Sequence, residues 1–206
     1  MLMLTRAIRS GLLCCTLFLS IATASGANAA SLQRCENLRQ EVRVAHYQYL
    51  GTDFPYHYSI GQLQQESNCK NVISLDGVGS EGPAQITYRI WKESLRKQGI
   101  GEVKSTKNNL RAQAYINYLA RKQDPHKKLW VSYQIYNGGG LVLKEISRAG
   151  KLDWAAAKAV CRRKTIHFKG GYSENACDIN YSYSRQLFKY GNAYRTSPDS
   201  PKYLYW

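Results

Sequence analysis

The sequence predicts a mainly helical single domain that carries a basic, helical C-terminal extension. Apolar residues recur every three or four positions in several segments, the strand candidates are all short, and no sequence repeat of useful length is present. The chain has 206 residues, of which 44% are hydrophobic, which is enough for one core and leaves two small domains as an alternative. Wholesale disorder, a collagen fold and a coiled coil do not fit this composition.

Residues 1–29 have the three parts of a secretory signal peptide. Arg6 and Arg9 precede an apolar run from Gly11 to Ala22, and small residues follow at 27–29. The run is shorter than the about 20 residues that a membrane-spanning helix needs, so we expect cleavage after residue 29 and no permanent membrane span. Cleavage removes two arginines and no acid, which lowers the formal charge from +15 to +13. We therefore expect an exported protein that is periplasmic or associated with the cell wall.

The excess of positive charge predicts a polyanionic partner, such as nucleic acid, anionic lipid or an anionic cell-wall polymer. Basic residues are spread over both residues 30–140 and residues 141–206. A dedicated nucleic-acid arm would be a local block of like charge, and an exported protein has no routine reason to meet DNA. We therefore expect a partner other than nucleic acid.

Four cysteines remain after cleavage of the signal peptide: Cys35, Cys69, Cys161 and Cys177. An even number in an exported chain indicates two disulfides, for which three pairings are possible. We hypothesise that Cys35 pairs with Cys69 and Cys161 with Cys177, because each pair closes a short loop within one region. Metal binding is the rival explanation, but no Cys-x-x-Cys or His-x₃₋₅-His spacing supports it, so we expect no metal and no cofactor.

Helical periodicity and capping signals predict most of the secondary structure. Helices are expected from Leu32 to a stop at Gly51, from Tyr58 to Ser67, from Pro83 through Trp91 toward Gln98, from Asn108 to Lys122, from Lys128 to Tyr136, from Trp154 to Arg163 with Asp153 as the cap, and from Ser182 to Tyr194. Glycine, asparagine and aspartate make residues 68–82 a loop that holds a short hairpin at most. The glycines at 138–140 are expected to stop the helix before them.

Glu66 is the first candidate for acid chemistry. It stands at the end of a predicted apolar helix and directly before a glycine-rich loop, where a carboxyl can be partly buried and still face a cleft. Partial burial raises the pKa of a carboxyl, as a general acid working near neutral pH requires. From its position alone, an ordinary solvated glutamate at a helix end is the competing interpretation.

Three local patterns strengthen the case for Glu66. Gln-Gln-Glu-Ser at 64–67 is followed by Gly-Pro-Ala-Gln-Ile-Thr at 82–87 and by Ile-Tyr-Asn-Gly-Gly at 135–139. In this order and spacing they resemble the motifs of the lytic transglycosylases with a goose-type-lysozyme-like fold. That family has a Glu-Ser pair, then Gly-x-x-Gln-hydrophobic, then Ala-Tyr-Asn-x-Gly. The resemblance covers residues 56–140, and it implies a lysozyme-like catalytic domain at residues 30–140 with residues 141–206 outside the family's core.

The chain departs from the family pattern at two places. Pro83-Ala84 stands where the family more commonly has Leu-Met, which changes packing beside the sugar groove and leaves the subsite preference open. The same motif, Gly82-Pro83 with Gln85 and then Trp91, is similar to the Gly-Pro-Met-Gln version of a related membrane-bound branch. Ile135 stands where the third motif usually has alanine, and we interpret it as a core residue.

The resemblance implies cleavage of the β-1,4 bond between N-acetylmuramic acid and N-acetylglucosamine in peptidoglycan strands. Glu66 would protonate the leaving oxygen and then take a proton from the C6 hydroxyl of muramic acid, which closes a 1,6-anhydro ring without a water nucleophile. By match to the motifs, Ser67 and Tyr136 would orient Glu66 or the sugar, and Gln85 would hydrogen-bond a saccharide. Two glycines, Gly82 and Gly139, would permit close approach of the backbone. Asn137 also matches the motif, and a polar helix cap is its alternative role.

Three other functions stay open at this point. Asp76 or Glu81 would supply the second carboxylate of a true muramidase with the same fold, although acids in loops are usually just solvated. A non-catalytic, basic protein that binds the wall or assists envelope assembly would keep the fold without the activity. A secretion system or a phage also uses such a domain to open the wall locally, and either is a possible partner.

Overall fold

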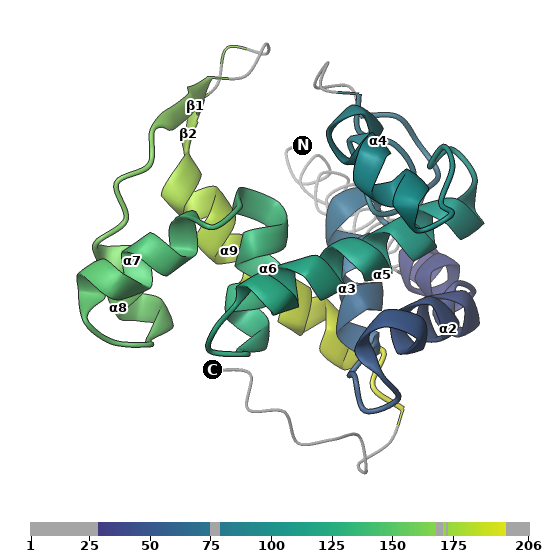
Figure 1. The fold of residues 1–206 in the computed structure, drawn as a ribbon, viewed down its shortest axis with the longest axis horizontal. Coiled ribbons are helices and arrows are strands. Elements are labelled where there is room, and N and C mark those ends of the chain that lie inside the picture. Colours follow the sequence, from purple (N-terminus) through teal and green to yellow (C-terminus); the bar gives the residue numbers. More distant parts are fainter. Residues whose placement is uncertain (1–28, 75–78, 168–170, 172, 197–206) are drawn as a thin grey trace, which may run out of the picture.

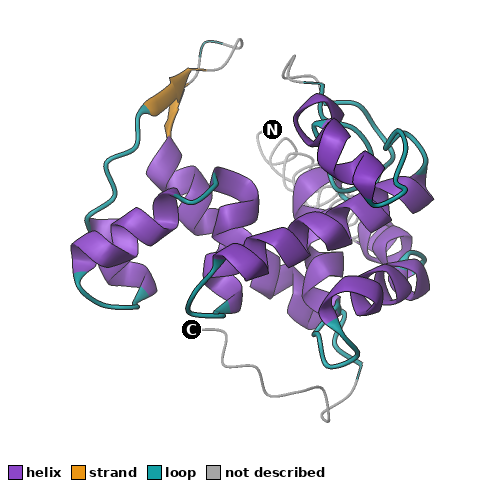
Figure 2. Cartoon of the chain, viewed as in Figure 1, coloured by secondary structure: helices purple, strands orange, loops and turns teal. Residues whose placement is uncertain are grey.

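The computed structural model describes residues 29–74, 79–167, 171 and 173–196 (Figure 1). Residues 1–28 of the expected signal peptide lie outside this part. The described chain is mainly helical, as predicted, with a two-stranded antiparallel sheet (Figure 2). After a short helix at 29–36, the elements are α2 (Arg39–Leu50), α3 (His57–Ser67), α4 (Tyr88–Lys97), α5 (Thr106–Gln123), α6 (Leu129–Gly138), α7 (Leu141–Ala149), α8 (Trp154–Ala159), β1 (Thr165–His167), β2 (Ser173–Asn175) and α9 (Ala176–Ala193).

The helices form a central group with further elements on two sides. Helices α3, α5, α6 and α9 occupy the middle, with α2 and α4 on one side and α7, α8 and the hairpin on the other (Figure 1). Helix α9 packs against both α3 and α6, and α5 packs against α2 and α6. Residues 176–193 of the expected extension thus form part of the central group.

The core consists of two clusters of buried apolar side chains. One lies mainly among α3, α6, α7 and α9, and it includes Trp130 and Tyr181. The other lies among α3, α4 and α5, and it includes Ile60 and Leu63, which face inward as predicted. Tyr136 packs against both clusters, so the end of α6 lies where the two meet.

Helices α3 and α9 approach each other closely at two glycines. A Cβ atom added to Gly61 would lie 2.4 Å from the backbone nitrogen of Gly191, and one added to Gly191 would lie 2.4 Å from Cδ1 of Tyr58. Real Cβ atoms do not approach other atoms so closely, so only glycine fits the crossing. The crossing brings the side chains of α9 beside those of α3, although the two helices are far apart in sequence.

Both hypothesised disulfides are confirmed. Cys35 pairs with Cys69 across a sequence separation of 34 residues, and Cys161 pairs with Cys177 across 16. Two disulfides are typical of a protein from an oxidising, extracellular environment. Among the described residues, no helix is both long and apolar enough to cross a membrane.

In the N-terminal half of the chain, two predicted helices differ clearly from their expected boundaries. The helix from Leu32 is divided, because a turn at residues 37–38 interrupts it, and the N–H of Leu38 donates to the carbonyl of Cys35 instead of continuing the α-helical pattern. The helix expected from Pro83 begins only at Tyr88. Residues 82–85 form a turn, closed by the N–H of Ile86 donating to the carbonyl of Glu81 at 2.9 Å.

The C-terminal region contains more structure than predicted. Helix α7 was missed, because the three glycines at 138–140 indicate a stop, whereas the chain begins a new helix at Leu141 directly after them. Asp153 caps α8 as expected by accepting from the N–H of Ala156, but α8 ends at Ala159. Helix α9 begins at Ala176 rather than at Ser182, because the side chain of Asn175 accepts from the N–H of Cys177 and supplies the cap there.

Candidate functional site

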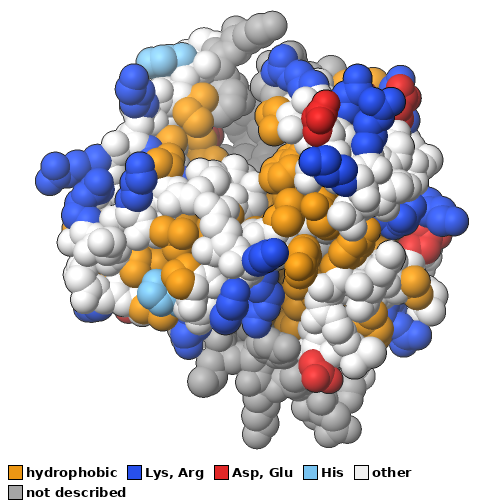
Figure 3. All heavy atoms as spheres, in the orientation of Figure 1, with side chains coloured by type: hydrophobic (Ala, Val, Ile, Leu, Met, Phe, Trp, Pro, Cys, Tyr) orange, Lys and Arg blue, Asp and Glu red, His pale blue; other side chains and the backbone are white. Residues whose placement is uncertain are grey.

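A cleft of about 1100 Å³ lies between the end of α3, the turn before α4, helix α5 and the end of α6. Its lining is mixed: apolar residues come from α4, α5 and α6, and polar residues come from the segment between α3 and α4 and from the ends of α5 and α6. On the face shown in Figure 3, hydrophobic side chains gather in the middle, and Lys and Arg side chains lie both beside them and along the outer parts. Residues from all three motifs line the cleft, among them Glu66, Gln85, Tyr136, Asn137 and Gly139.

Glu66 lies in the last turn of α3 and is half-buried in this cleft. Burial raises the pKa of its carboxyl from an ordinary value of 4.5 to about 7, while a hydrogen bond from Tyr183 opposes part of the rise. It is the only acid among the described residues that line the cleft. A carboxyl with this pKa exchanges its proton near neutral pH, so it can act first as an acid and then as a base.

The nearest partner of Glu66 is Tyr183, a buried residue of α9 that the sequence analysis did not single out. The hydroxyl of Tyr183 donates to Oε1 of Glu66 at 2.6 Å, across a sequence separation of 117 residues. Burial and the charge of Glu66 raise the pKa of Tyr183 well above its ordinary value, so the hydroxyl stays protonated and remains a donor. No local motif marks Tyr183, because its link to Glu66 exists only in the folded chain.

A buried chain of hydrogen bonds holds Tyr183 in turn. Nε2 of Gln62 donates to the hydroxyl of Tyr183 at 3.1 Å. Oε1 of Gln62 accepts from Nε2 of Gln113 and from Nδ2 of Asn117, both at 2.9 Å. Since Gln62, Gln113 and Asn117 are buried, these bonds are shielded from water and fix the orientation of the tyrosine beside Glu66.

Tyr136 lies on the cleft wall, and its hydroxyl donates to the carbonyl of Ala84 at 3.1 Å. Burial and the charge of Glu66 raise the pKa of Tyr136 well above its ordinary value. The third motif is thus joined to the turn of the second motif, and residues of both line the cleft together with Glu66.

Ser67 and Gln85 are engaged with backbone groups. Oγ of Ser67 donates to the carbonyl of Pro83 at 2.8 Å and accepts from the N–H of Lys70 at 3.1 Å. Nε2 of Gln85 donates to the carbonyls of Gly82 at 2.8 Å and Val72 at 3.1 Å. Ser67 therefore ties the end of α3 to the turn, whereas Gln85 braces the turn and presents its remaining surface to the cleft.

The two motif glycines serve the fold in different ways. Gly82 has a φ of 76°, and a Cβ there would lie 2.2 Å from Nδ2 of Asn109. Asn109 is a second residue that the sequence analysis missed: it donates to the carbonyl of Glu81 and accepts from the N–H of Ala84, so it holds the turn from within. Gly139 has a φ of 68°, and no atom of the described residues lies within 4 Å of a Cβ added there. Its role is therefore to let the backbone turn at the end of α6, and no other part of the chain that the structure describes packs closely against it.

Asn137 is exposed and lies between this cleft and a second pocket. Its Oδ1 accepts from Nδ2 of Asn180 at 2.9 Å, which links α6 to α9. In the described chain its side chain therefore joins two helices, and it is Gly139 that forms the cap of α6.

Glu81 and Asp76 are the two candidates for a second carboxylate. Glu81 forms the bridge positions opposite Ile73 and Ile86 and is not among the lining residues. Asp76 lies outside the described residues. Within the part of the chain that the structure describes, no group of three or more His, Cys, Asp or Glu side chains is arranged to hold a metal ion.

Comparison of the chain with protein-family models and with curated proteins finds no match. The functional interpretation therefore depends on the residues and on their geometry. The strongest element of that geometry is a half-buried carboxyl with a raised pKa in a large cleft, because strongly perturbed pKa values cluster at functional sites.

Proposed function

We propose that the protein is a peptidoglycan lytic transglycosylase with Glu66 as its single general acid and base. The observation that carries this proposal is the position of Glu66: its pKa is raised to about 7, and it is the only acid among the described residues that line the cleft. The motifs at 64–67, 82–87 and 135–139 support the same function. The proposal includes a lysozyme-like fold for the catalytic domain and export to the periplasm or cell wall.

The reaction begins with a proton transfer from Glu66. The protonated carboxyl donates to the oxygen of the β-1,4 bond, the bond from that oxygen to C1 of muramic acid breaks, and the N-acetylglucosamine unit leaves with the proton. Tyr183 donates a hydrogen bond to the carboxylate that remains. The N-acetyl group of the substrate stabilises the positive charge that develops at C1.

The carboxylate then acts as the base. It removes the proton from the C6 hydroxyl of muramic acid, and O6 bonds to C1 to close the 1,6-anhydro ring. Glu66 recovers its proton, and no water is consumed. An ordinary glycosidase needs a second carboxylate, either as nucleophile or to activate water, whereas an internal nucleophile makes one carboxyl sufficient.

The cleft offers groups that suit a glycan strand. Trp91 lines it and presents an aromatic surface on which a sugar ring can stack. Gln85 and Asn137 supply amide groups for sugar hydroxyls and acetamido groups. The positive charge of the chain attracts it to the anionic wall, and salt should weaken this attraction.

The test compares the mature protein with its Glu66→Gln variant on purified peptidoglycan, with released products identified by mass spectrometry. We expect products that end in 1,6-anhydro-muramic acid, and a loss of at least about 10²-fold in the variant because a positioned general acid is removed. Binding to the wall should stay nearly unchanged, since glutamine has the same shape.

Three outcomes would contradict parts of the proposal. Reducing ends instead of anhydro ends would make the protein a muramidase and direct the search to Asp76 and Glu81. Full activity in Glu66→Gln would show that Glu66 is not the general acid and that the active site has been assigned wrongly. Release of no product by either form, with binding intact and a required partner excluded, would favour a non-catalytic wall-binding protein.

A further inference from the structure

A second pocket, of about 670 Å³, adjoins the cleft at Asn137, which lines both. Helix α7, the segment after α8, strand β1 and the start of α9 surround it. Its lining is strongly basic. The basic residues are Lys144, Arg148, Arg162, Arg163 and Lys164, and the only acid among the described lining residues is Glu145.

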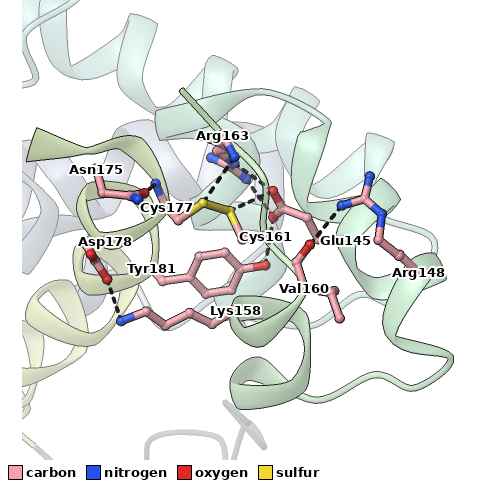
Figure 4. Close-up of a disulfide and its surroundings, with 10 residues drawn as sticks. All are labelled: Glu145, Arg148, Lys158, Val160, Cys161, Arg163, Asn175, Cys177, Asp178 and Tyr181. Atoms are coloured by element: carbon pink, nitrogen blue, oxygen red, sulfur yellow. Dashed lines mark hydrogen bonds and ion pairs between the residues drawn. A yellow bond between two sulfur atoms is a disulfide. The ribbon is translucent and has the colours of Figure 1, made fainter. Parts of the chain in front are cut away.

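The charge of Glu145 is already neutralised within the protein. Nε and Nη2 of Arg163 donate to its two carboxylate oxygens at 2.8 and 2.9 Å, and the hydroxyl of Tyr181 donates at 2.7 Å (Figure 4). The two charged side chains are only 8% and 4% exposed. The Cys161–Cys177 disulfide lies beside them and joins the segment after α8 to the start of α9. We call the Glu145–Arg163 pair, together with this disulfide, the floor of the pocket. The positive charge of the other four basic residues is not compensated by any acid of the described lining.

A buried acceptor without a partner also belongs to this pocket. Asn180 is 2% exposed, and its Nδ2 donates to Oδ1 of Asn137 and to the carbonyl of Gln134. Its Oδ1 has no hydrogen-bond partner among the described residues. A buried acceptor of this kind costs free energy unless a ligand donor or a water reaches it. The pocket thus offers cationic donors, and one residue of its lining carries an unpaired amide oxygen.

We propose that this pocket binds the stem peptide of the peptidoglycan strand through its free carboxylates and an amide N–H. The inference extends the proposed function, because it requires a strand in the adjacent cleft. A stem peptide is attached to the lactyl group of muramic acid, so a sugar bound beside Asn137 brings its peptide to the boundary between cleft and pocket. An extended peptide spans about 3.3–3.6 Å per residue, so three or four residues reach well across a pocket of this size.

Recognition would follow from ordinary charge chemistry. Lysine and arginine form their strongest hydrogen bonds with carboxylates, and Arg148 is held in place by donating to the carbonyl of Val160 at 2.9 Å. Asn180 of the lining carries an unpaired amide oxygen, which a peptide N–H reaches once the side chain turns toward the pocket. A glycan strand without peptides lacks these peptide carboxylates and keeps only the lactyl carboxylate on the sugar itself, so the pocket distinguishes the two substrates.

The test neutralises the pocket and leaves its floor intact. The variant carries Lys144→Gln, Arg162→Gln and Lys164→Gln, three exposed side chains that take no part in the Glu145–Arg163 pair. The matched control carries Arg43→Gln, Lys107→Gln and Lys189→Gln, which remove the same charge from exposed positions outside both lining sets. Both are assayed on glycan strands with intact stem peptides and on the same strands after an amidase has removed the peptides.

We expect the wild type and the control to have a KM about tenfold lower on peptide-bearing strands than on peptide-free strands. One or two charge-assisted hydrogen bonds to the peptide strengthen binding by about this factor. The pocket variant should lose this preference and keep the wild-type kcat/KM on peptide-free strands. An equal preference in all three proteins, or an equal loss in variant and control, would overturn the inference.

A binding measurement separates this inference from the proposed reaction. The Glu66→Gln protein is titrated with a soluble stem tetrapeptide, with the same peptide after amidation of its carboxylates, with inorganic polyphosphate and with vesicles of anionic phospholipid. We expect binding of the free peptide alone, with a loss in the pocket variant. Binding of polyphosphate or vesicles in preference to the peptide would overturn the inference in favour of another anion. Activity on peptide-free strands tests the proposed function independently.

Discussion

The hydroxyl of Tyr183 lies 2.6 Å from Oε1 of Glu66 and joins the last turn of α3 to the middle of α9. The tyrosine is buried and is itself held by Gln62, so its direction is fixed before any substrate binds. A donor in this position lowers the pKa of Glu66, whereas burial raises it. The balance between the two sets the pH range over which Glu66 can donate a proton.

Replacing Tyr183 by phenylalanine should shift the pH profile upward. The donor stabilises the charged carboxylate, so its removal raises the pKa of Glu66 further above about 7. A general acid must be protonated in the free enzyme, so kcat/KM falls as the pH rises through this pKa. In Tyr183→Phe we expect the fall to move up by about one pH unit and the maximum rate to drop roughly tenfold as the carboxyl loses its fixed orientation.

Tyr194→Phe is the matched control for this prediction. Its hydroxyl also donates to a side chain of α3, Gln64, at 2.6 Å, and it is also buried, but it does not contact Glu66. The control should lose a similar amount of stability and keep the wild-type pH profile of kcat/KM. Identical profiles for wild type and Tyr183→Phe would show that the hydrogen bond does not tune Glu66.

Glu66→Gln should stabilise the protein at alkaline pH. The pKa of the folded-state carboxyl, about 7, lies above its ordinary value of 4.5. Ionisation is therefore harder in the folded state, and the wild type loses stability as the pH rises from about 4.5 to about 7. Glutamine does not ionise, so the variant should gain up to about 3 kcal/mol in unfolding free energy near pH 8.5 and almost nothing near pH 4.

Urea unfolding at the two pH values measures this difference. Glu41→Gln, at an exposed position of α2, controls for the change in net charge. A gain of the same size at both pH values would mean that the carboxyl is not penalised by burial, and the case for a tuned acid would fail.

Gly61→Ala should separate α3 from α9. The new Cβ would lie 2.4 Å from the nitrogen of Gly191 and 2.5 Å from the carbonyl oxygen of Leu187, and neither backbone atom can move by a rotamer change. We expect a loss of at least about 2 kcal/mol in unfolding free energy, together with a fall in activity because Tyr183 moves away from Glu66. Gly101→Ala is the control, since its nearest neighbour lies 3.8 Å away. A stability equal to that of the control would contradict the close crossing.

The sequence predicted those features that depend on short-range patterns. Periodicity placed α3, α5 and α6 within two residues of their observed ends, and the side chain of Asp153 marked the start of α8. Three spaced motifs were enough to select Glu66, Gln85, Tyr136 and Asn137, which the fold brings to one cleft. Their spacing along the chain carries this information without any tertiary contact.

Long-range contacts were beyond such patterns. Tyr183 and Asn109 show no local signature, because the groups that they hold lie 117 and 25 residues away, at Glu66 and at Ala84. Helix α7 was missed for a related reason. Its start after three glycines is favoured by packing of Val142 and Ile146 in the core, and a local rule for helix ends cannot register that packing.

The buried pair of Arg163 and Glu145 gives the last prediction. Removing one partner leaves the other charge buried, so Arg163→Met should destabilise the protein by about 3–5 kcal/mol. The double variant Arg163→Met with Glu145→Gln should recover more than half of that loss, because the neutral amide still accepts from Tyr181. Lys158→Met, which breaks the exposed pair with Asp178, should cost less than about 1 kcal/mol. Urea unfolding of the wild type and the three variants measures these changes in unfolding free energy. If Arg163→Met lost no more stability than Lys158→Met, the Glu145–Arg163 pair would not fix the pocket floor.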